Sequence, residues 1–593
     1  MPLKKRLQQL WDELEQRHLD GFLVPRTDKH QGEYVPPYAE RLAWLTGFTG
    51  SAGIAIVHRH GSAIFVDGRY VLAVREQVDE TVFKPHNIKD CPPEKWLSQQ
   101  PAAKLGYDPW LHTPKGLAPL QRACEKVGSQ LIACDSNPID ALWSDQPEPP
   151  QAAIRPHPLQ YAGKTSQAKR EQIGSQLAKD QITAAILTAP DSIAWLLNIR
   201  GGDIPYTPLP LSFAIVYTNG QVDWFINSAQ LEPGLREHLG EAVTIHSPAS
   251  LGNRLDKLGQ THQAVLVDHK HSAAWILNRL TAAGAKIIKQ ADPCALPKAC
   301  KNAVEQAGAK AAHHRDGIAL TRFLHWLDTT SDNVDEIQAA ERLAQFRKET
   351  NLLHDLSFET ISAAGSHAAI VHYQVTPETN QTLQSGSLYL VDSGGQYLDG
   401  TTDVTRTVAI GTPTAEQKDR FTRVLKGHIR VAACRFPKTT TGIQLDILAR
   451  HALWQVGLDY DHGTGHGVGS FLSVHEGPQN LSKRLIDVAL KPGMILSNEP
   501  GYYKKDAFGI RIENLLMVTE PEAIDGGEIE MMGFETLTRA PIDLNLIEPS
   551  LLNQAEIAWL NNYHQTVYQE MGAELTEEVR TWLAQATRSI SDQ

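Results

Sequence analysis

Five side chains that commonly bind metals lie between residues 392 and 513, each beside a strand-like or glycine-rich stretch. They are Asp392 in V-D-S-G-G, Asp403 in T-T-D-V-T, His466 in G-H-G-V-G, Glu499 in N-E-P-G and Glu513 in R-I-E-N. Burying four carboxylates and one imidazole together is unfavourable unless cations neutralise them. The set therefore predicts two divalent ions, and its oxygen-rich chemistry suits Mn²⁺, Co²⁺, Fe²⁺ or Zn²⁺. Two neighbouring metals can hold a hydroxide that hydrolyses an amide.

The first two of these residues lie on a predicted β-hairpin. Residues 387–391 read as a strand that Asp392 ends, and turn signals around Asp399-Gly400 lead into a second strand over 403–410. On adjacent strands the carboxylates of Asp392 and Asp403 converge, and they repel one another unless a cation lies between them. The alternative is that these aspartates only end strands and form turns.

Three histidines follow within a short stretch. His462 and His466 lie in H-G-T-G-H-G-V-G, and His475 lies in S-V-H-E-G-P. The repeated glycines exclude a helix and let an extended backbone pass close to a ligand. A lone histidine is more often structural, but three so close together indicate a site.

The last two ligands follow predicted strands. Glu499 ends a strand over 494–498 and precedes Pro500-Gly501. Arg511 and Glu513 stand two apart on a strand predicted over 509–518, so both are expected to point to the same face. Arg511 could then hold a carboxylate beside the metals by paired hydrogen bonds. Taken alone, Arg511 and Glu513 could equally form an exposed ion pair.

Two earlier segments read as diverged copies of one another. The first has G-F-L-V-P-R-T-D at 21–28, A-W-L-T-G at 43–47 and an apolar strand at 52–57; the second has A-A-I-L-T-A-P-D at 184–191, A-W-L-L-N at 194–198 and an apolar strand at 211–216. Strands that alternate with helices predict two related α/β domains. The proline-rich stretch 145–151 and the segment 292–297 mark their ends, which predicts domains at 1–155, 156–293 and 294–593.

The third domain carries all five candidate ligands and is predicted to be α+β. Residues 303–327 read as a helix, and its adjacent His313 and His314 are expected on the surface rather than at a metal. Short strands with glycine-rich turns follow from about residue 355. Helices are expected at 415–434 and 442–454, with two charged helices after residue 552.

In order and spelling, these motifs resemble the dinuclear pita-bread metallopeptidases, and within them the long, three-domain aminopeptidase P (Xaa-Pro aminopeptidase) family. The likeness includes L-V-P-R-T-D-K-H-Q-G-E-Y, G-F-T-G-S-A-G and V-D-G-R-Y near the N-terminus, I-A-W-L-L-N-I-R-G in the second domain and W-L-N-N-Y-H near the end. It implies two creatinase-like α/β domains before a pita-bread catalytic domain. It also implies release of the N-terminal residue from peptides with proline in the second position.

The resemblance implies a role for each metal ligand. Asp392 would chelate one metal, and Asp403 and Glu513 would bridge both. His466 and Glu499 would complete the second metal. The implied cofactors are two divalent ions per chain, with Mn²⁺ the first expectation and Zn²⁺ or Co²⁺ as alternatives.

The same resemblance assigns residues to the substrate. His372 in V-H-Y and His475 match histidines that contact substrate, and His462 matches one that lines the pocket beside the scissile bond. Arg511 is expected to support the ligands. Glu499 is favoured as the general base, and His475 can stabilise the oxyanion.

Composition limits the expected partners. The formal net charge of −12 argues against non-specific nucleic-acid binding. No apolar run reaches membrane-spanning length, and the six cysteines lack C-x-x-C spacing, so we expect a cytoplasmic protein that binds no membrane. The resemblance implies that its partners are Xaa-Pro peptides and a second copy of the chain, in a homodimer formed through the last domain.

Three alternatives share this fold. A prolidase would have the same metal site but cleave only dipeptides, and the sequence does not identify the group that would capture their carboxylate. A creatinase-like amidinohydrolase would lack parts of the ligand set. A non-catalytic binding module would have lost ligands, whereas all five are present here.

Overall fold

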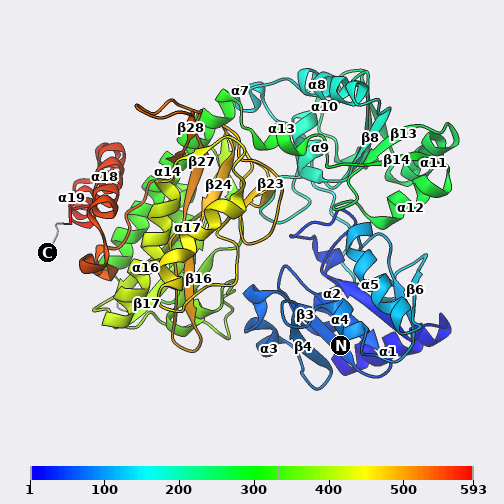
Figure 1. Cartoon of the computed structure of the whole chain (residues 1–593), viewed down its shortest axis with the longest axis horizontal. Helices are drawn as coiled ribbons and strands as arrows, with labels where there is room; N and C mark the ends of the chain where they lie inside the picture. The colour runs from blue at the N-terminus through cyan, green and yellow to red at the C-terminus, as the bar shows by residue number, and fades with distance from the viewer. Residues whose placement is uncertain (1–2, 331–332, 591–593) are drawn as a thin grey trace. The chain divides into compact units, whose positions relative to one another are not determined.

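The computed structural model describes residues 3–330 and 333–590, and Figure 1 traces their helices and strands. The chain forms two compact units. The first runs through His157 and continues over Lys164–Ala295, and the second contains Pro158–Gly163 and Leu296 onward. The first unit holds two α/β domains, and the second holds the α+β domain.

The first α/β domain is built on a six-stranded mixed sheet. Its spatial order is β4 (Phe83–Asn87), β3 (Ser62–Val66), β2 (Ile54–His58), β1 (Gly21–Pro25), β5 (Lys104–Tyr107) and β6 (Gln130–Ala133). The central strands β1 to β3 pair antiparallel, and the outer strands β4, β5 and β6 pair parallel with their neighbours. Strands β1, β2, β3 and β5 are mainly apolar because α4 (Pro93–Leu97) and α5 (Pro114–Lys126) cover one face of the sheet.

The second α/β domain repeats this topology. Its order is β12 (Val243–His246), β11 (Val222–Phe225), β10 (Phe213–Tyr217), β8 (Ala184–Leu187), β13 (Ala264–Val267) and β14 (Lys286–Lys289). Every pair has the same relative direction as its counterpart in the first sheet. Helices α11 (Leu251–Gln260) and α12 (Ala274–Ala282) pack on its apolar strands. The shared strand order confirms that the two segments have one architecture.

The third domain places short sheets among long helices, which confirms the α+β prediction. One sheet joins β16 (Ile361–Ala364), β17 (Ser387–Ser393) and β20 (Val404–Ile410); another joins β23 (Glu476–Leu481), β22 (Gly465–Gly467), β24 (Ile495–Asn498), β27 (Asn514–Val518) and β29 (Phe534–Thr536). The hairpin of β25 (Gly501–Lys504) and β26 (Phe508–Arg511) lies between β24 and β27 in sequence. Helices α14 (Ala303–Thr330), α15 (Glu336–Lys348), α16 (Ala415–Ala432) and α17 (Gly442–Trp454) lie alongside these strands (Figure 1).

Two more helices close the domain, as predicted: α18 (Gln554–Met571) and α19 (Glu577–Ala586). A short upstream helix, α7 (Leu159–Ala162), also belongs to this unit and packs near the start of α14. There Asn302 Nδ2 donates to Ala162 O at 2.9 Å. Gly163 ends α7 with a positive φ of 66°, and a Cβ on it would stand 2.2 Å from Asn302 Oδ1. Close packing and backbone conformation together therefore require glycine there.

The expectation that His313 lies on the surface is wrong, because it is only 2% exposed. Helix α14 is embedded in its domain: Cβ atoms on Gly308 and Gly317 would stand 2.3 and 2.4 Å from neighbouring carbonyl oxygens. Burial lowers the pKa of His313 to about 4, and its Nδ1 donates to a carbonyl of the same helix. The adjacent His314 is half-exposed and pairs with Glu574 at 2.6 Å.

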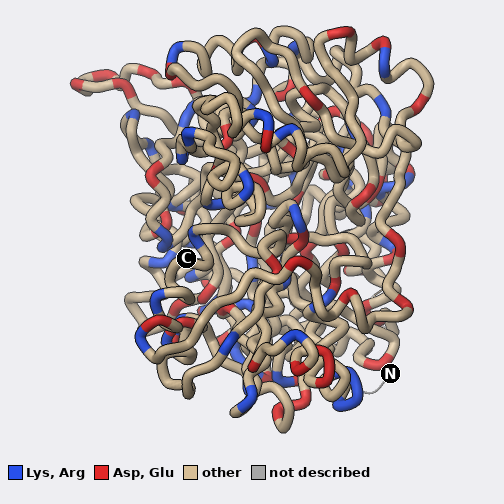
Figure 2. The backbone as a smooth tube through the Cα atoms, turned by 90° about the vertical axis from the view of Figure 1, so that its right-hand side faces the viewer, with Lys and Arg blue, Asp and Glu red and all other residues tan. Residues whose placement is uncertain are grey.

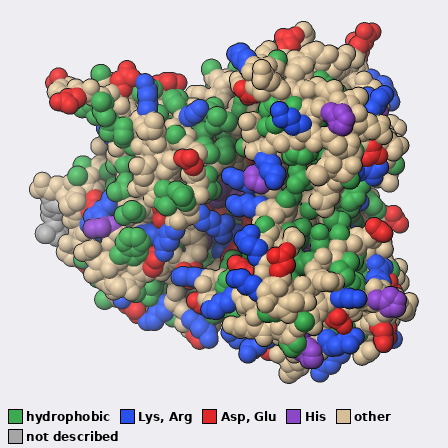
Figure 3. Space-filling model, turned by 45° about the vertical axis from the view of Figure 1, so that its right-hand side comes forward, with side chains coloured by type: hydrophobic (Ala, Val, Ile, Leu, Met, Phe, Trp, Pro, Cys, Tyr) green, Lys and Arg blue, Asp and Glu red, His purple; other side chains and the backbone are tan. Residues whose placement is uncertain are grey.

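Charged residues of both signs are spread along the chain. Figure 2 shows Lys and Arg interspersed with Asp and Glu along the backbone, and Figure 3 shows the same mixture between apolar side chains on one face. Across the part of the chain that is described, no helix combines the length and the apolar character that a bilayer crossing requires.

Candidate metal centre

Two antiparallel strands bring the predicted aspartate ligands together. Asp392 lies near the end of β17 opposite Thr405 of β20, and Asp403 immediately precedes β20. The predicted hairpin is confirmed, with a small ribbon of β18 (Gly395–Tyr397) and β19 (Gly400–Thr401) inserted in its turn. Both carboxylates are buried, and Oδ1 of each has no hydrogen-bond partner. Cations would satisfy these buried acceptors.

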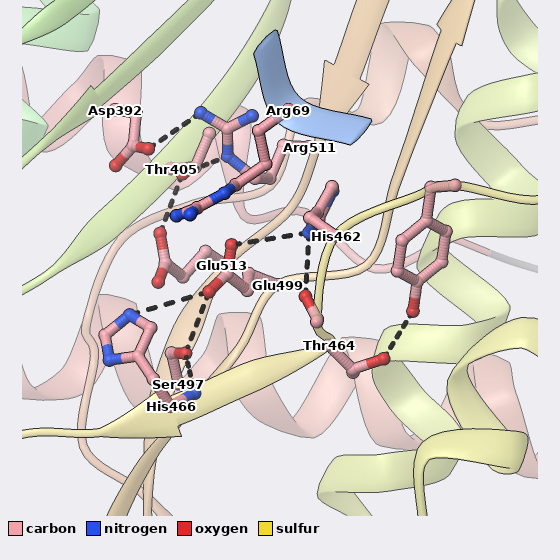
Figure 4. A network of polar contacts seen from close by, with 12 residues as sticks. Arg69, Asp392, Thr405, His462, Thr464, His466, Ser497, Glu499, Arg511 and Glu513 are labelled. Atoms are coloured by element: carbon pink, nitrogen blue, oxygen red, sulfur yellow. Dashed lines mark hydrogen bonds and ion pairs between the residues drawn. The ribbon is translucent and has the colours of Figure 1, made fainter. Parts of the chain in front are cut away.

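Adjacent strands of the five-stranded sheet supply His466 and Glu499. His466 Nδ1 donates to Gly467 O at 2.9 Å, which directs Nε2 toward the carboxylates (Figure 4). Nε2 stands 3.4 Å from Asp403 Oδ2 and 3.5 Å from Glu499 Oε1. Ser497 Oγ accepts from His466 N at 2.9 Å and donates to Glu499 Oε1 at 3.1 Å. These hydrogen bonds orient an imidazole nitrogen for metal binding.

The segment with Arg511 and Glu513 is not one strand, so the strand predicted over 509–518 is wrong. β26 ends at Arg511 in one hairpin, and β27 begins at Asn514 in a different sheet. The backbone changes sheets at this point, where Glu513 N donates to Thr405 O at 3.2 Å. The side chains still converge: Thr405 Oγ1 donates to Glu513 Oε2 at 2.7 Å and accepts from Arg511 Nε at 3.2 Å (Figure 4).

Arg511 compensates part of the negative charge. Its guanidinium is buried, with Nη2 donating to Asp392 Oδ2 and Nη1 donating to Tyr503 OH, each at 2.7 Å. One guanidinium and one imidazole do not balance four carboxylates. The remaining negative charge favours divalent cations in the cluster.

Three overlapping groups of ligand atoms could each hold an ion among the described residues: Asp392, Asp403 and Glu513; His466, Glu499 and Glu513; and Asp403, His466 and His475. Within each group the ligand atoms lie within 4.8 Å of one another. The structure thus brings all five predicted ligands together. His475, predicted to contact substrate, belongs to the third group, and its ring centroid lies 4.2 Å from that of His466.

Two other predicted site residues lie outside these groups. His462 Nδ1 donates to Gly463 O at 2.7 Å and stands 3.8 Å from Glu499 Oε2, while Tyr503 OH donates to its Nε2 at 2.9 Å. His372 is half-buried in the loop after η5 (Gly365–Ala369). His462 therefore borders the ligand cluster directly, and His372 belongs to none of the three groups.

Sequence analysis missed a buried network behind the ligands. Arg406 of β20 donates to Glu513 O at 2.7 Å and to Asn514 Oδ1 at 2.9 Å. His428 of α16 lies 3.2 Å from Asn514 Nδ2, and its carbonyl accepts from Asn498 Nδ2 at 2.9 Å. The asparagines beside two glutamate ligands thus connect β24, β27 and α16. In the sequence, the signal for this network was that each of the two glutamate ligands has an asparagine next to it, as N-E at 498–499 and E-N at 513–514.

An ion pair between two residues one turn apart on α17 holds the loop that carries His462. Arg450 Nε donates to Asp446 Oδ2 at 2.7 Å, and Arg450 Nη2 donates to His462 O at 2.8 Å. Asp446 Oδ1 also accepts from Thr464 Oγ1 at 2.6 Å. Glu499 N then donates to Thr464 O at 2.8 Å, which joins this loop to the strand of the glutamate ligand.

Without cations, the centre holds protons more tightly than isolated side chains do. Burial raises the pKa of Glu499 to about 7 and, with repulsion from neighbouring carboxylates, raises the pKa of Asp392 and of Glu513 as well. Burial alone would lower the pKa of His466, but its hydrogen bond to Asp403 and the charge of Glu499 raise that pKa to about 9. Cations would compete with these protons.

We expect protein freed of metal by chelation to lose stability as pH rises from about 4.5 to about 7. Folded Glu499 keeps its proton up to about pH 7, whereas the unfolded carboxyl releases it near 4.5, so stabilisation present below 4.5 is lost through 7. The upper bound is about 3 kcal/mol. Thermal unfolding midpoints across this range would measure it. The metal-free Glu499→Gln variant is the control, and an equal pH dependence in that variant would contradict the assignment.

Four stretches of the sequence match known protein families. The Creatinase/Prolidase N-terminal domain matches residues 6–142 and, as a second related family, residues 145–305. Metallopeptidase family M24 matches residues 307–520. The C-terminal region of peptidase M24 matches residues 530–590. All five ligands lie within the M24 match.

Curated relatives match almost the full chain. The "Probable Xaa-Pro aminopeptidase P" of Aspergillus flavus is 39% identical over 609 residues, covering 99% of this chain and 93% of that protein. The protein of the same description from Aspergillus niger is 38% identical over 610 residues, covering 99% of each chain.

Solved structures agree over the same extent. An X-prolyl aminopeptidase from Caenorhabditis elegans, described as "a cytosolic enzyme with a di-nuclear active site", superposes with a TM-score of 0.94 at 32% identity and covers 100% of both chains. A prolidase from Thermococcus sibiricus covers 64% of this chain and 99% of its own, with a TM-score of 0.52 at 22% identity. That second likeness shows the fold alone.

Proposed function

Because the chain belongs to metallopeptidase family M24 and groups there with Xaa-Pro aminopeptidase P, we propose that it releases the N-terminal residue from peptides with proline in the second position. The observation that carries this proposal is the complete set of converging ligand groups. An amidinohydrolase or a non-catalytic module is disfavoured because all five ligands are present.

The proposed cofactors are two divalent ions, with Mn²⁺ first and Zn²⁺ or Co²⁺ as alternatives. Asp392 would chelate one ion, Asp403 and Glu513 would bridge both, and His466 and Glu499 would complete the second. The unpartnered Oδ1 atoms of the two aspartates support these assignments. When bound, the ions supply Lewis-acid activation of the scissile carbonyl and of water.

The remaining steps fall to side chains of the chain itself. Glu499 is the proposed general base and would pass its proton to the proline nitrogen. His475 would donate to the oxyanion of the attacked carbonyl. His462 and His372 would contact the substrate beside the scissile bond. Arg511 holds Asp392 in place through its 2.7 Å hydrogen bond.

The proposed setting follows the same relatives. We place the enzyme in the cytoplasm, supported by the description of the C. elegans protein as cytosolic. Its proposed assembly is a homodimer through the last domain, as the family resemblance implies. Its proposed partners are Xaa-Pro peptides, with no nucleic acid and no membrane among them.

Three peptides, with the dipeptide Arg-Pro as a further comparison, test the specificity with added Mn²⁺. Arg-Pro-Pro should be cleaved with a kcat/KM at least about 100-fold above that of Arg-Ala-Pro, because only the ring positions the scissile carbonyl. Proline offers no N–H, so a shaped pocket must select it. Acetyl-Arg-Pro-Pro should resist cleavage because the free amine is expected to anchor near the metals. Comparable rates on all three would contradict the proposal, and cleavage confined to the dipeptide Arg-Pro would indicate a prolidase.

A further inference from the structure

A buried ion cluster lies immediately beside His475 in sequence. Lys298 Nζ donates to Glu476 Oε2 at 2.6 Å, and Lys301 Nζ donates to Glu476 Oε1 at 2.5 Å. All three side chains are at most 2% exposed. Each carboxylate oxygen thus receives its own ammonium group. We call Lys298, Lys301 and Glu476 the lysine clamp.

The lysine end of the clamp is fixed to the strand that leads to a metal ligand. Lys301 N donates to Gly493 O at 3.0 Å, and the preceding residue, Cys300, forms a β-bridge with Met494. Lys301 Nζ also donates to Lys298 O at 3.0 Å, which ties the two lysines together. Residues 493–494 directly precede β24, and Glu499 follows β24. The backbone that carries the two lysines is therefore fixed relative to the strand that precedes Glu499.

Glu476, the carboxylate of the clamp, lies at the end of an irregular loop. Residues 468–475 form no helix or strand, so regular strand pairing does not fix His475. Glu476 is the first residue of β23 and pairs with Gly467, the neighbour of His466. Adjacent Cα atoms are about 3.8 Å apart, so displacement of Glu476 displaces His475.

We infer that the lysine clamp is a positioning device for His475, fixing that histidine relative to His466 and Glu499 without itself touching substrate or metal. The inference rests on the substrate role proposed above for His475. Charge-assisted hydrogen bonds to both carboxylate oxygens restrict the side chain more than a single contact would.

The charges of the clamp determine which variants can test it. Removing either lysine leaves the other ammonium group paired with the Glu476 carboxylate. Removing the carboxylate would instead take the shared anion away from two buried lysines, which is strongly destabilising. Lys298→Met and Lys301→Met keep most of the apolar side-chain volume. They are therefore two independent tests of the same device.

Each variant is compared with wild type for kcat on Arg-Pro-Pro and for metal content. Either lysine variant should lower kcat by about 10- to 100-fold, the scale expected for a misplaced group, and should keep two metals per chain. In a His475→Ala background the same lysine substitution should change kcat by less than about twofold, because the histidine it positions is gone. Lys310→Met is the matched control, since Lys310 forms a half-exposed pair with Glu535 in the same unit.

Equal loss of kcat in the wild-type and His475→Ala backgrounds would overturn the inference, and so would loss of metal in the lysine variants. Unchanged kcat in both lysine variants would overturn it as well. Failure of the role proposed for His475 is distinguishable, because His475→Ala by itself would then leave kcat unchanged.

Discussion

Replacing His466 with alanine is expected to abolish peptide hydrolysis and to lower bound metal from two ions per chain toward one. This residue is the single nitrogen ligand among the five predicted ligands, and its Nε2 faces Asp403 and Glu499 at 3.4 and 3.5 Å. A water molecule in the space left by the side chain cannot replace the imidazole, whose orientation is fixed by the hydrogen bond to Gly467 O. Loss of one activating ion forfeits several kcal/mol of transition-state stabilisation, so kcat/KM should fall by more than about 1,000-fold.

Elemental analysis of the purified variant and its rate on Arg-Pro-Pro would measure both effects. His314→Ala is the matched control, because that histidine pairs with Glu574 and joins none of the ligand groups. Metal content and activity equal to wild type in His466→Ala would remove His466 from the ligand set.

His475→Ala is expected to keep both metals and to lose kcat by about 10²–10³-fold, the usual effect of removing one oxyanion donor. The reason is its proposed position beside the attacked carbonyl rather than at the end of a metal bond. Its ring lies 4.2 Å from that of His466, so the structure also permits a ligand role. The two measurements separate these roles: metal lost in step with activity would make His475 a ligand and would show the proposed division of roles to be wrong.

The ligands could be predicted from sequence because each sits in a short local motif. Turn residues around Asp399 and Gly400 predict a hairpin, and the pairing of Asp392 with Thr405 confirms it. The two α/β domains could also be predicted from sequence, since a strand, a helix and another strand recur in the same order in each. Such local patterns survive divergence because every element has to bury its own apolar side.

The errors and omissions have a different cause, because they depend on contacts distant in sequence. Apolar residues on both sides of Arg511 and Glu513 make 509–518 look like one strand, which hides the point where the backbone passes from one sheet to another. Helical spacing predicts a surface position for His313 because it does not reveal which sides of α14 the rest of the domain covers. Arg406 looks like an ordinary strand residue, yet it donates to Glu513 O across 107 positions of the chain. Tertiary packing alone determines such contacts.

The position of α7 has a consequence for how this protein could have been assembled in evolution. The chain enters the catalytic unit at Pro158, leaves it after Gly163 and returns at Leu296. The second α/β domain is therefore joined to segments of the catalytic unit at both of its ends. Exchange of that domain by recombination would need two compatible joints, and an exchange that carried α7 away would remove the acceptor of Asn302 at the head of α14. The long form is accordingly expected to be inherited as one block.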